Sequence, residues 1–106
     1  MTILGNITYL GHSVFTACNL SSFTIPDTIS TLKYWTFYAC FNLKSIEIPK
    51  NIISIEYEVF CLCSKLESIS ILGNITSIPY RAFSDCYSLP SFTIPENITS
   101  LGEYVF

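Results

Sequence analysis

The chain has 106 residues, half of them hydrophobic and only 12% charged, and its formal net charge is −3. An average globular domain carries about 25% charged residues, so the composition indicates an unusually large share of inward-facing positions. Five basic against eight acidic residues leave no excess positive charge to neutralise a phosphate backbone. We therefore do not expect nucleic acid as a partner.

The first 26 residues contain no Asp, Glu, Lys or Arg, which raises the question of a membrane span or a signal peptide. Polar residues interrupt this stretch throughout, and no basic segment precedes it. Both features argue against an apolar span and against a signal peptide. We expect no membrane span here and interpret the stretch as the first coil and a half of a repeat.

A unit of about 23 residues recurs along the chain, most clearly as FYACFNLKSIEIPKNIISIEYEV at positions 37–59. Its first residue recurs as Phe15, Phe37, Phe60, Phe83 and Phe106. A Cys follows three residues later in four copies (Cys18, Cys40, Cys63, Cys86), and then a Leu (Leu20, Leu43, Leu66, Leu89). Further apolar columns complete the unit, among them Phe23/Ile46/Ile69/Phe92, Ile25/Ile48/Ile71/Ile94, Ile29/Ile52/Ile75/Ile98, Leu10/Leu32/Ile55/Ile78/Leu101 and Val14/Thr36/Val59/Ala82/Val105. Such a period predicts a solenoid, because one coil cannot bury its apolar side until neighbours stack on it.

Within each coil the pattern predicts two short extended segments and a turn. The alternation L-K-S-I-E-I over Leu43–Ile48 indicates a strand that ends at Pro49. A second extended segment is expected at Ser54–Ile55, Ser77–Ile78 and Ser100–Leu101. About eight residues around each Phe remain, too few for a helix of ordinary length, so we expect a tight turn or a 3₁₀ turn there.

The fold class predicted is therefore a mainly-β repeat solenoid, a single solenoid over 1–106 with about four and a half coils. The chain enters the repeat partway through a unit and stops on Phe106, the first residue of another. Solenoids need polar terminal caps, so we expect a piece of a longer array with further repeats of its own chain. One repeat position holds proline in three copies (Pro26, Pro49, Pro95) and leucine in the two copies where Gly-Asn follows (Leu4, Leu72). This indicates two kinds of turn at the same position of the repeat.

Five cysteines invite a metal or a disulfide interpretation. Four of them share one column, and strand spacing of about 4.8 Å would place the first and last about 14 Å apart, too far for tetrahedral zinc coordination. Disulfides also fit poorly, because the Cβ atoms of stacked neighbours lie wider apart than a disulfide allows. We expect no metal, and buried reduced thiols acting as small hydrophobes. Cys61 lies outside the column, and we expect it to point outward and to be the reactive thiol.

No arrangement of catalytic residues emerges. His12 is the only histidine and shares a column with Tyr34, Tyr57 and Tyr80. No carboxylate is placed to orient its ring, and the adjacent acids Glu56 and Glu58 resemble a solvated face more than an acid–base pair. Four glycines form no phosphate-binding loop. We expect a non-enzymatic protein without a cofactor. For the tyrosine column and Trp35 two readings remain, an aromatic interface or a cover over one edge of the coils, and the second is favoured.

The outward positions of the main strand carry hydroxyl groups in seven places of eight. They are Ser22, Thr24, Ser45, Glu47, Ser68, Ser70, Ser91 and Thr93. One reading is that these side chains only satisfy a parallel strand face and bond along the ladder. The other is a shallow polar platform for a partner, since repeat solenoids commonly bind through extended surfaces. These eight residues are the candidate partner-binding positions.

Asn-x-Ser/Thr occurs four times, at Asn6, Asn19, Asn74 and Asn97. Three of the four share one repeat column, so their number owes much to the repeat itself. They are candidate N-glycosylation sites only if the chain is secreted by a cell that has this machinery.

The pattern L-x-x-I-x-I-P-x-x-I-x-x-I-x-x-x-x-F-x-x-C resembles the BspA-like class of leucine-rich repeats over the whole chain. The resemblance implies a right-handed leucine-rich-repeat coil with a parallel β-sheet, and a cell-surface or secreted protein used for adhesion or protein–protein recognition. It implies a protein or cell-surface partner and brings no catalytic residues. The alternative is an intracellular, cytoplasmic scaffold or regulatory adaptor, which reduced cysteines would permit.

Overall fold

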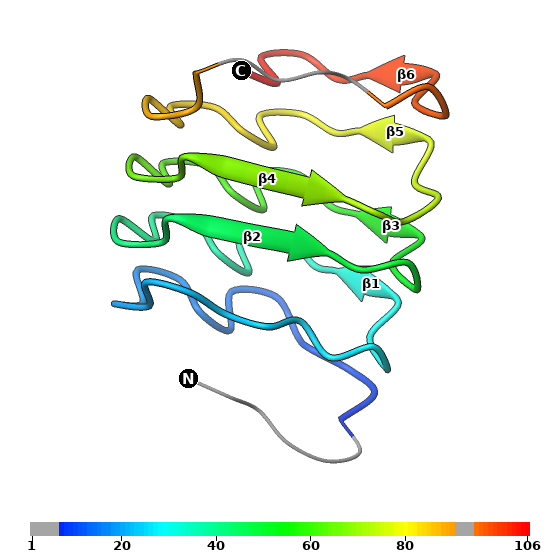
Figure 1. Ribbon diagram of the computed structural model, residues 1–106, viewed down its shortest axis with the longest axis horizontal. Helices are drawn as coiled ribbons and strands as arrows, with labels where there is room; N and C mark the ends of the chain where they lie inside the picture. Colours follow the sequence, from blue (N-terminus) through cyan, green and yellow to red (C-terminus); the bar gives the residue numbers. More distant parts are fainter. Residues whose placement is uncertain (1–6, 91–94) are drawn as a thin grey trace.

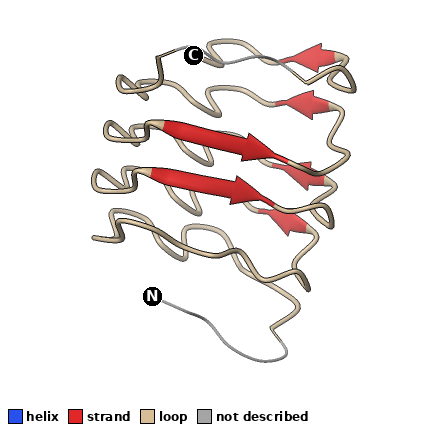
Figure 2. Ribbon diagram, in the orientation of Figure 1, coloured by secondary structure: helices blue, strands red, loops and turns tan. Residues whose placement is uncertain are grey.

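The computed structural model describes residues 7–90 and 95–106, which form a stack of coils running from the N-terminal to the C-terminal end (Figure 1). The described part contains short strands joined by turns and no helix (Figure 2). The strands are β1 (Thr31–Leu32), β2 (Ser45–Ile48), β3 (Ser54–Ile55), β4 (Ser68–Ile71), β5 (Ser77–Ile78) and β6 (Ser100–Leu101). The fold is a mainly-β solenoid, as the repeat predicts.

Strands one repeat apart pair in parallel and in register. In β2 and β4, Ser45 lies opposite Ser68 and Glu47 opposite Ser70. β1 pairs with β3, and β5 pairs with β6. The predicted strand ending before Pro49 and all three predicted second segments are confirmed. The equivalent of β2 at 22–25 forms no strand, and the equivalent at 91–94 lies outside the described residues.

The second extended segments of the coils form a second row of strands, β1, β3, β5 and β6. A proline determines where the pairing along this row is interrupted. The residue that follows β3 and the residue that follows β6 each donate their N–H to the coil before, from Glu56 to Leu32 O at 2.8 Å and from Gly102 to Ile78 O at 2.7 Å. Pro79 occupies the same place after β5 and has no N–H to offer the β3 coil. This explains why β3 and β5 belong to separate two-stranded sheets.

The same rule applies to the main strand. Leu72 donates its N–H to Ile48 O at 2.9 Å and so extends the pairing of β2 with β4. Pro49 holds the corresponding position in the preceding coil and cannot donate, in keeping with the missing strand at 22–25. Gly73 completes the leucine version of the turn, because a Cβ there would lie 2.6 Å from the carbonyl oxygen of Ile52.

The turns around the phenylalanines form a second connection between coils, which we call the turn edge (12–17, 34–39, 57–62, 80–85 and 103–104). Backbone bonds cross it from coil to coil, for example Phe37 N–H to Val59 O at 3.0 Å and Phe60 N–H to Ala82 O at 3.0 Å. Residues two places before and two places after the phenylalanines are left-handed, namely Ser13, Ala17, Trp35, Ala39, Glu58, Leu62, Arg81, Asp85 and Tyr104. The tight turn predicted here is confirmed, and the described residues use left-handed turns in place of 3₁₀ segments.

The phenylalanine column is the centre of the core. Its rings are stacked nearly parallel, with centroids 5.4 Å apart for Phe37–Phe60 and 5.6 Å for Phe60–Phe83. Those three side chains are almost fully buried, whereas Phe106 is 58% exposed although its ring stacks on Phe83. Val14 and Leu101, which the repeat predicts to be inward, are also about half exposed. Each lies in a coil near one end of the stack, where fewer neighbours cover it.

The cysteine column is a row of hydrogen-bond donors. Each Sγ lies 3.1 Å from the carbonyl oxygen of the phenylalanine in the coil before it: Cys40 to Phe15, Cys63 to Phe37 and Cys86 to Phe60. A thiol is a weak donor, but it suits a narrow space beside a buried carbonyl. All five cysteines are free in the structure; of the column, Cys40 and Cys63 are buried as predicted, whereas Cys18 and Cys86 are half-buried.

Burial sets the acidity of these thiols. Desolvation raises the pKa of Cys40 to about 11 and that of Cys86 to about 12, and it raises the pKa of Cys63 further still. The expectation that Cys61 points outward is wrong. Its side chain is fully buried, and burial raises its pKa as well. Turn residues on both sides of each Phe are left-handed, so the alternation of a strand does not extend to Cys61.

Candidate functional site

The outward positions of the main strand form a continuous exposed strip, which we call the hydroxyl face. Its described members are Ser22, Thr24, Ser45, Glu47, Ser68 and Ser70, all of them exposed or nearly so. Parallel pairing of β2 with β4 places Ser45 beside Ser68 and Glu47 beside Ser70, and Ser22 and Thr24 hold the same repeat positions in the coil before. Ser91 and Thr93 lie outside the described residues. The rows predicted from the repeat are therefore present along the described strands.

The side chains of the hydroxyl face have no hydrogen-bond partner within residues 7–90 and 95–106. The second strand row carries the same kinds of residue in the same register and differs at one of its two pairs. There the hydroxyl of Ser54 on β3 donates to that of Thr31 on β1 at 3.3 Å. The paired Ser77 and Ser100 of β5 and β6 make no such bond. The reading in which hydroxyls bond along the ladder therefore fits one pair of the second row and none of the described main-strand pairs.

The hydroxyl face is almost uncharged. Glu47 is its only ionisable member, and the exposed Lys44 and Lys50 lie three residues to either side of it. The strip therefore lacks the concentrated charge that would attract a polyanion or a polycation.

A stack of aromatic rings lies along the turn edge. The His12 ring stacks on Tyr34 with centroids 4.6 Å apart, and Tyr34 stacks on Tyr57 at 5.0 Å. Tyr57 and Tyr80 are each 42% exposed. His12 is also exposed, and Tyr34 is half-buried, so the column lies at the surface. Because the rings cover one another, the stack fits the favoured reading of a cover over the coil edge.

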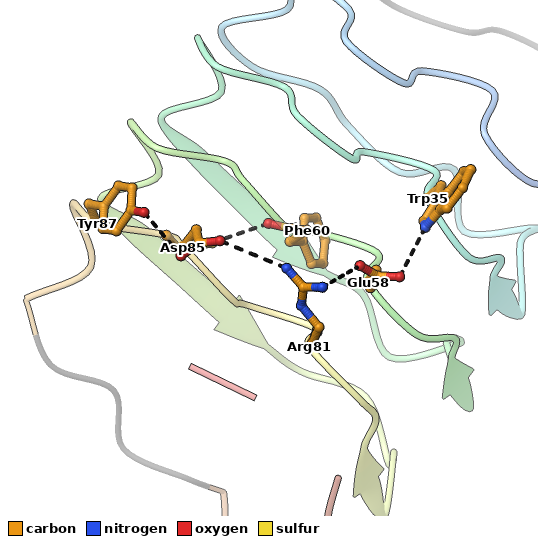
Figure 3. A network of polar contacts seen from close by, with 7 residues as sticks. Trp35, Glu58, Phe60, Arg81, Asp85 and Tyr87 are labelled. Carbon is orange, nitrogen blue, oxygen red and sulfur yellow. Dashed lines mark hydrogen bonds and ion pairs between the residues drawn. The ribbon is translucent and has the colours of Figure 1, made fainter. Parts of the chain in front are cut away.

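A polar network connects three coils beside this stack (Figure 3). Trp35 Nε1 donates to Glu58 Oε1 at 3.2 Å, and the other oxygen of Glu58 lies 3.5 Å from the Arg81 guanidinium. Arg81 also pairs with Asp85 at 3.9 Å, and the Tyr87 hydroxyl donates to Asp85 at 3.0 Å, which raises the pKa of Tyr87. The network links one coil to the next.

Sequence analysis did not identify this network. Its signal is the spacing of Trp35, Glu58 and Arg81, which are 23 residues apart and share one column of the repeat. Residues that share a column stand side by side in adjacent coils, so an acid between an indole donor and a guanidinium indicates such a contact.

The four sequons lie in different surroundings. Asn6 is outside the described residues, and Asn74 is exposed. The Asn97 amide donates to Ile75 O at 2.9 Å, and Asn19 accepts a bond from the Asn42 amide. Glycosylation of these residues stays a prediction.

Other site types have little support in the described part of the chain. Among residues 7–90 and 95–106, no group of three His, Cys, Asp or Glu side chains is placed to hold a metal ion. His12 contacts Ser13 and the Tyr34 ring, and no carboxylate of these residues bonds to its ring nitrogens. The same residues include no helix long and apolar enough to cross a membrane.

Comparison with known proteins points to one family. A family model described as BspA type leucine-rich repeat region matches residues 1–106, with six copies of the repeat. A leucine-rich cell surface protein from Faecalibacterium prausnitzii A2-165 is 31% identical, with a TM-score of 0.78 over 83% of this chain. Leucine-rich repeat proteins from Eubacterium ventriosum and Bacteroides ovatus are 27% and 26% identical over 99% of it, with TM-scores of 0.82 and 0.71. No curated protein matches the chain. The chain spans 23%, 29% and 33% of the lengths of these three structures.

Proposed function

Because the chain belongs to the BspA type leucine-rich repeat family, we propose that it is a non-enzymatic recognition module of a cell-surface or secreted protein. In this proposal it mediates adhesion or recognition of a protein or cell-surface partner, and the hydroxyl face is its binding surface.

The observation that carries the proposal is that the exposed hydroxyls of the main strand make no hydrogen bond to other described residues. On the second row the hydroxyls of Thr31 and Ser54 bond to each other, whereas those of Ser45 and Ser68 on the main strand remain available. A regular row of exposed groups with free donors and acceptors is suited to contacts with a partner. Inward columns admit only apolar side chains of similar size, so specific contacts must come from outward positions.

A surface location is supported by the Faecalibacterium prausnitzii structure, which is described as a leucine-rich cell surface protein. Partial coverage of each neighbour supports the view that this module is one part of a longer repeat array. The second candidate function, an intracellular scaffold or adaptor, is favoured by the five free cysteines. Free thiols are typical of proteins in a reducing compartment. Three of these five are buried, however, and burial shields them from oxidation in other compartments as well.

The test is adhesion of the fluorescently labelled chain to cultured epithelial cells and to immobilised extracellular matrix proteins. The variant carries Ser45→Lys, Glu47→Lys, Ser68→Lys and Ser70→Lys. We expect it to lose adhesion, because four long charged side chains cover the face and would have to be desolvated against a partner that fits a nearly neutral surface. The fold should persist, since all four positions face outward and the charges stay solvated.

The matched control changes the turn edge instead, with Tyr34→Ser, Tyr57→Ser and Tyr80→Ser. It should keep most of the adhesion. If the tyrosine variant loses adhesion and the lysine variant keeps it, with circular dichroism unchanged in both, the binding surface is the turn edge and the assignment to the hydroxyl face is wrong.

A further inference from the structure

Adjacent coils can be bonded along three lines: the main strand, the second row of strands and the turn edge. The turn edge is bonded between all adjacent described turns, for example from Glu58 N–H to Tyr80 O at 3.0 Å. The two strand rows are bonded unevenly (Figure 1). β1 pairs with β3 while 22–25 and β2, on the main strand of the same two coils, are unpaired. At the next junction β2 pairs with β4 while β3 and β5 are unpaired. Two consecutive junctions are therefore open on different rows.

The gap between β3 and β5 extends beyond the strand residues themselves. At the repeat position just before these strands, Ile53 N–H donates to Ser30 O at 2.9 Å, and Thr99 N–H donates to Thr76 O at 2.8 Å. Thr76 holds the same position before β5, but its own N–H makes no bond to the β3 coil, although residues 49–58 and 72–81 are all described. Pro79, which follows β5, has no N–H to offer. The gap therefore begins before β5 and continues past its end.

A row of side-chain amides shows the same difference. The Asn51 amide donates to Ile29 O, and the Asn97 amide donates to Ile75 O at 2.9 Å, so each fastens its turn to the coil before. Asn74 occupies this position in the coil of β5, yet its side chain is exposed and makes no hydrogen bond to the described residues. The junction between β3 and β5 thus lacks the strand pair, the flanking backbone bond and the amide bond that the junctions on either side have.

Apolar contact keeps this junction closed on average. Ile55 on β3 and Ile78 on β5 are inward members of one column, and their side chains are 6% and 0% exposed. Apolar burial has no preferred direction, whereas a hydrogen bond fixes a distance and an angle. One coil can therefore tilt against the other on this side, while the register of β2 with β4 holds the main-strand side in place.

The main strand has a similar gap one junction earlier. Between 21–26 and 44–49, both described, the one backbone bond runs from Lys44 N–H to Ser21 O at 3.1 Å. Pro49 cannot supply the bond at the other end, which in the next coil is made by the residue after β4. Here the second row, where β1 pairs with β3, is the bonded side.

We infer that these two gaps are hinges of the solenoid, each placed by a proline. The second-row hinge lies between β3 and β5 and is set by Pro79, and the main-strand hinge lies between 22–25 and β2 and is set by Pro49. Segments with few backbone hydrogen bonds open locally at low cost in free energy, on timescales of microseconds to seconds. Opening of the main-strand hinge moves Ser22 and Thr24 relative to β2, whereas β2 and β4 keep their spacing. The hydroxyl face therefore has a fixed part and an adjustable part. This inference goes beyond the proposed function and does not depend on it.

The experiment is nuclear magnetic resonance of the whole chain, labelled with nitrogen-15, in reducing buffer. Amide hydrogen exchange, corrected for intrinsic rates, compares Thr76 with Ile53 at the same repeat position. The Thr76 amide should exchange at least about threefold faster, because it lacks the bond that the Ile53 amide makes. Relaxation dispersion, which detects opening on the microsecond-to-millisecond timescale, should be stronger at 76–78 and at 22–25 than in β4.

Pro79→Ala is the test variant, because it supplies an N–H that can donate to Ile55 O in the way that Glu56 N–H donates one coil earlier. It should slow the exchange of the Thr76 amide at least about threefold and reduce the dispersion at 76–78. Circular dichroism checks the fold. If Pro79→Ala does not fold, Pro79→Glu, which copies the residue at position 56, takes its place.

Pro49→Ala is the matched control, because it also replaces one proline by alanine but supplies its N–H to the main-strand hinge. It should leave the exchange of the Thr76 amide unchanged and reduce the dispersion at 22–25 instead. Each variant thus closes its own hinge and leaves the other as it is.

Three outcomes overturn the inference. Equal exchange of the Thr76 and Ile53 amides in the original chain would mean that β3 and β5 are bonded in solution. Fast exchange of Thr76 without dispersion at 76–78 would identify a static gap instead of a hinge. If Thr76 exchanges equally fast in Pro79→Ala, the missing N–H of the proline is not what keeps the junction open. None of these outcomes bears on the adhesion test of the lysine variant, so the proposed function stands or fails separately.

Discussion

The thiol of Cys63 donates a hydrogen bond to the carbonyl oxygen of Phe37, one coil earlier, with Sγ and O 3.1 Å apart. The same carbonyl also accepts the backbone N–H of Cys40 at 3.2 Å. Each such cysteine therefore fills a gap beside the phenylalanine column and satisfies a buried acceptor in its neighbour. We therefore expect both the volume of the thiol and its hydrogen bond to favour cysteine at this position.

Substitution of Cys63 by Ala and by Ser separates these two roles. If the donor matters, Cys63→Ser should remain more stable than Cys63→Ala by about 1 kcal/mol, because the serine hydroxyl can donate to Phe37 O. If the thiol only fills space, the order reverses, since a buried hydroxyl without a partner is costly. Urea unfolding of both variants under reducing conditions decides between the two.

Phe60→Ala should lower the free energy of unfolding by about 3–5 kcal/mol, because it empties the middle of the stacked phenylalanine column. Phe106→Ala is the matched control, since its ring is in the same column but 58% exposed. It should cost clearly less. A loss below about 1 kcal/mol for Phe60→Ala in a denaturant melt would show that this column is not the core.

Leu72→Pro should destabilise the chain by about 1–3 kcal/mol, although proline occupies this column in three other coils. The substitution removes the N–H that Leu72 donates to Ile48 O. Leu72→Ala keeps that bond and trims a half-exposed side chain, so its cost should be smaller. Equal melting curves for Leu72→Pro and the original chain would mean that this bond does not stabilise the pairing of β2 with β4.

Iodoacetamide labelling of the native chain should modify Cys18 first, because Cys18 is only half-buried while Cys40, Cys61 and Cys63 are buried. Cys86 is also half-buried, but its pKa is raised to about 12, so little of it is thiolate near neutral pH. Mass spectrometry of tryptic peptides at successive times gives the order. Early labelling of Cys61 would contradict its buried position and indicate that its side chain points outward.

Stability should fall at alkaline pH because of the buried thiols. Burial raises the pKa of Cys40 from an ordinary value of 9.0 to about 11, so the folded chain holds this proton more tightly than the unfolded chain does. Its contribution is complete below about pH 9 and is lost as the pH rises through about 11. Between pH 8 and pH 11 this thiol should account for about 2 kcal/mol of lost stability.

Cys40→Ser is the control for this titration, because serine does not ionise in that range. Unfolding by urea with reductant present should show a shallower decline with pH for Cys40→Ser than for the original chain. Parallel declines would mean that tyrosines or other groups, common to both proteins, cause the whole effect.

The period and the apolar columns were sufficient to predict the solenoid, the strand before Pro49 and all three second segments. Alternation of side chains and proline positions are local signals, and they act within one coil. They also placed Ser45 and Ser68 outward and paired, because stacked coils repeat the same register. Cys61 was misplaced since its orientation depends on left-handed turn residues, including Glu58 and Leu62, and no glycine marked them in the sequence.

Contacts between coils were decided by the tertiary structure alone. Repetition shows that Trp35, Glu58 and Arg81 share a column, but only the folded chain shows that the indole and the guanidinium meet the same carboxylate. Likewise, the donation from Cys63 to Phe37 and the free hydroxyls of the main strand arise from how one coil sits on the next. A repeated sequence specifies which residues become neighbours. Their hydrogen bonds depend on distances and angles that no single coil contains.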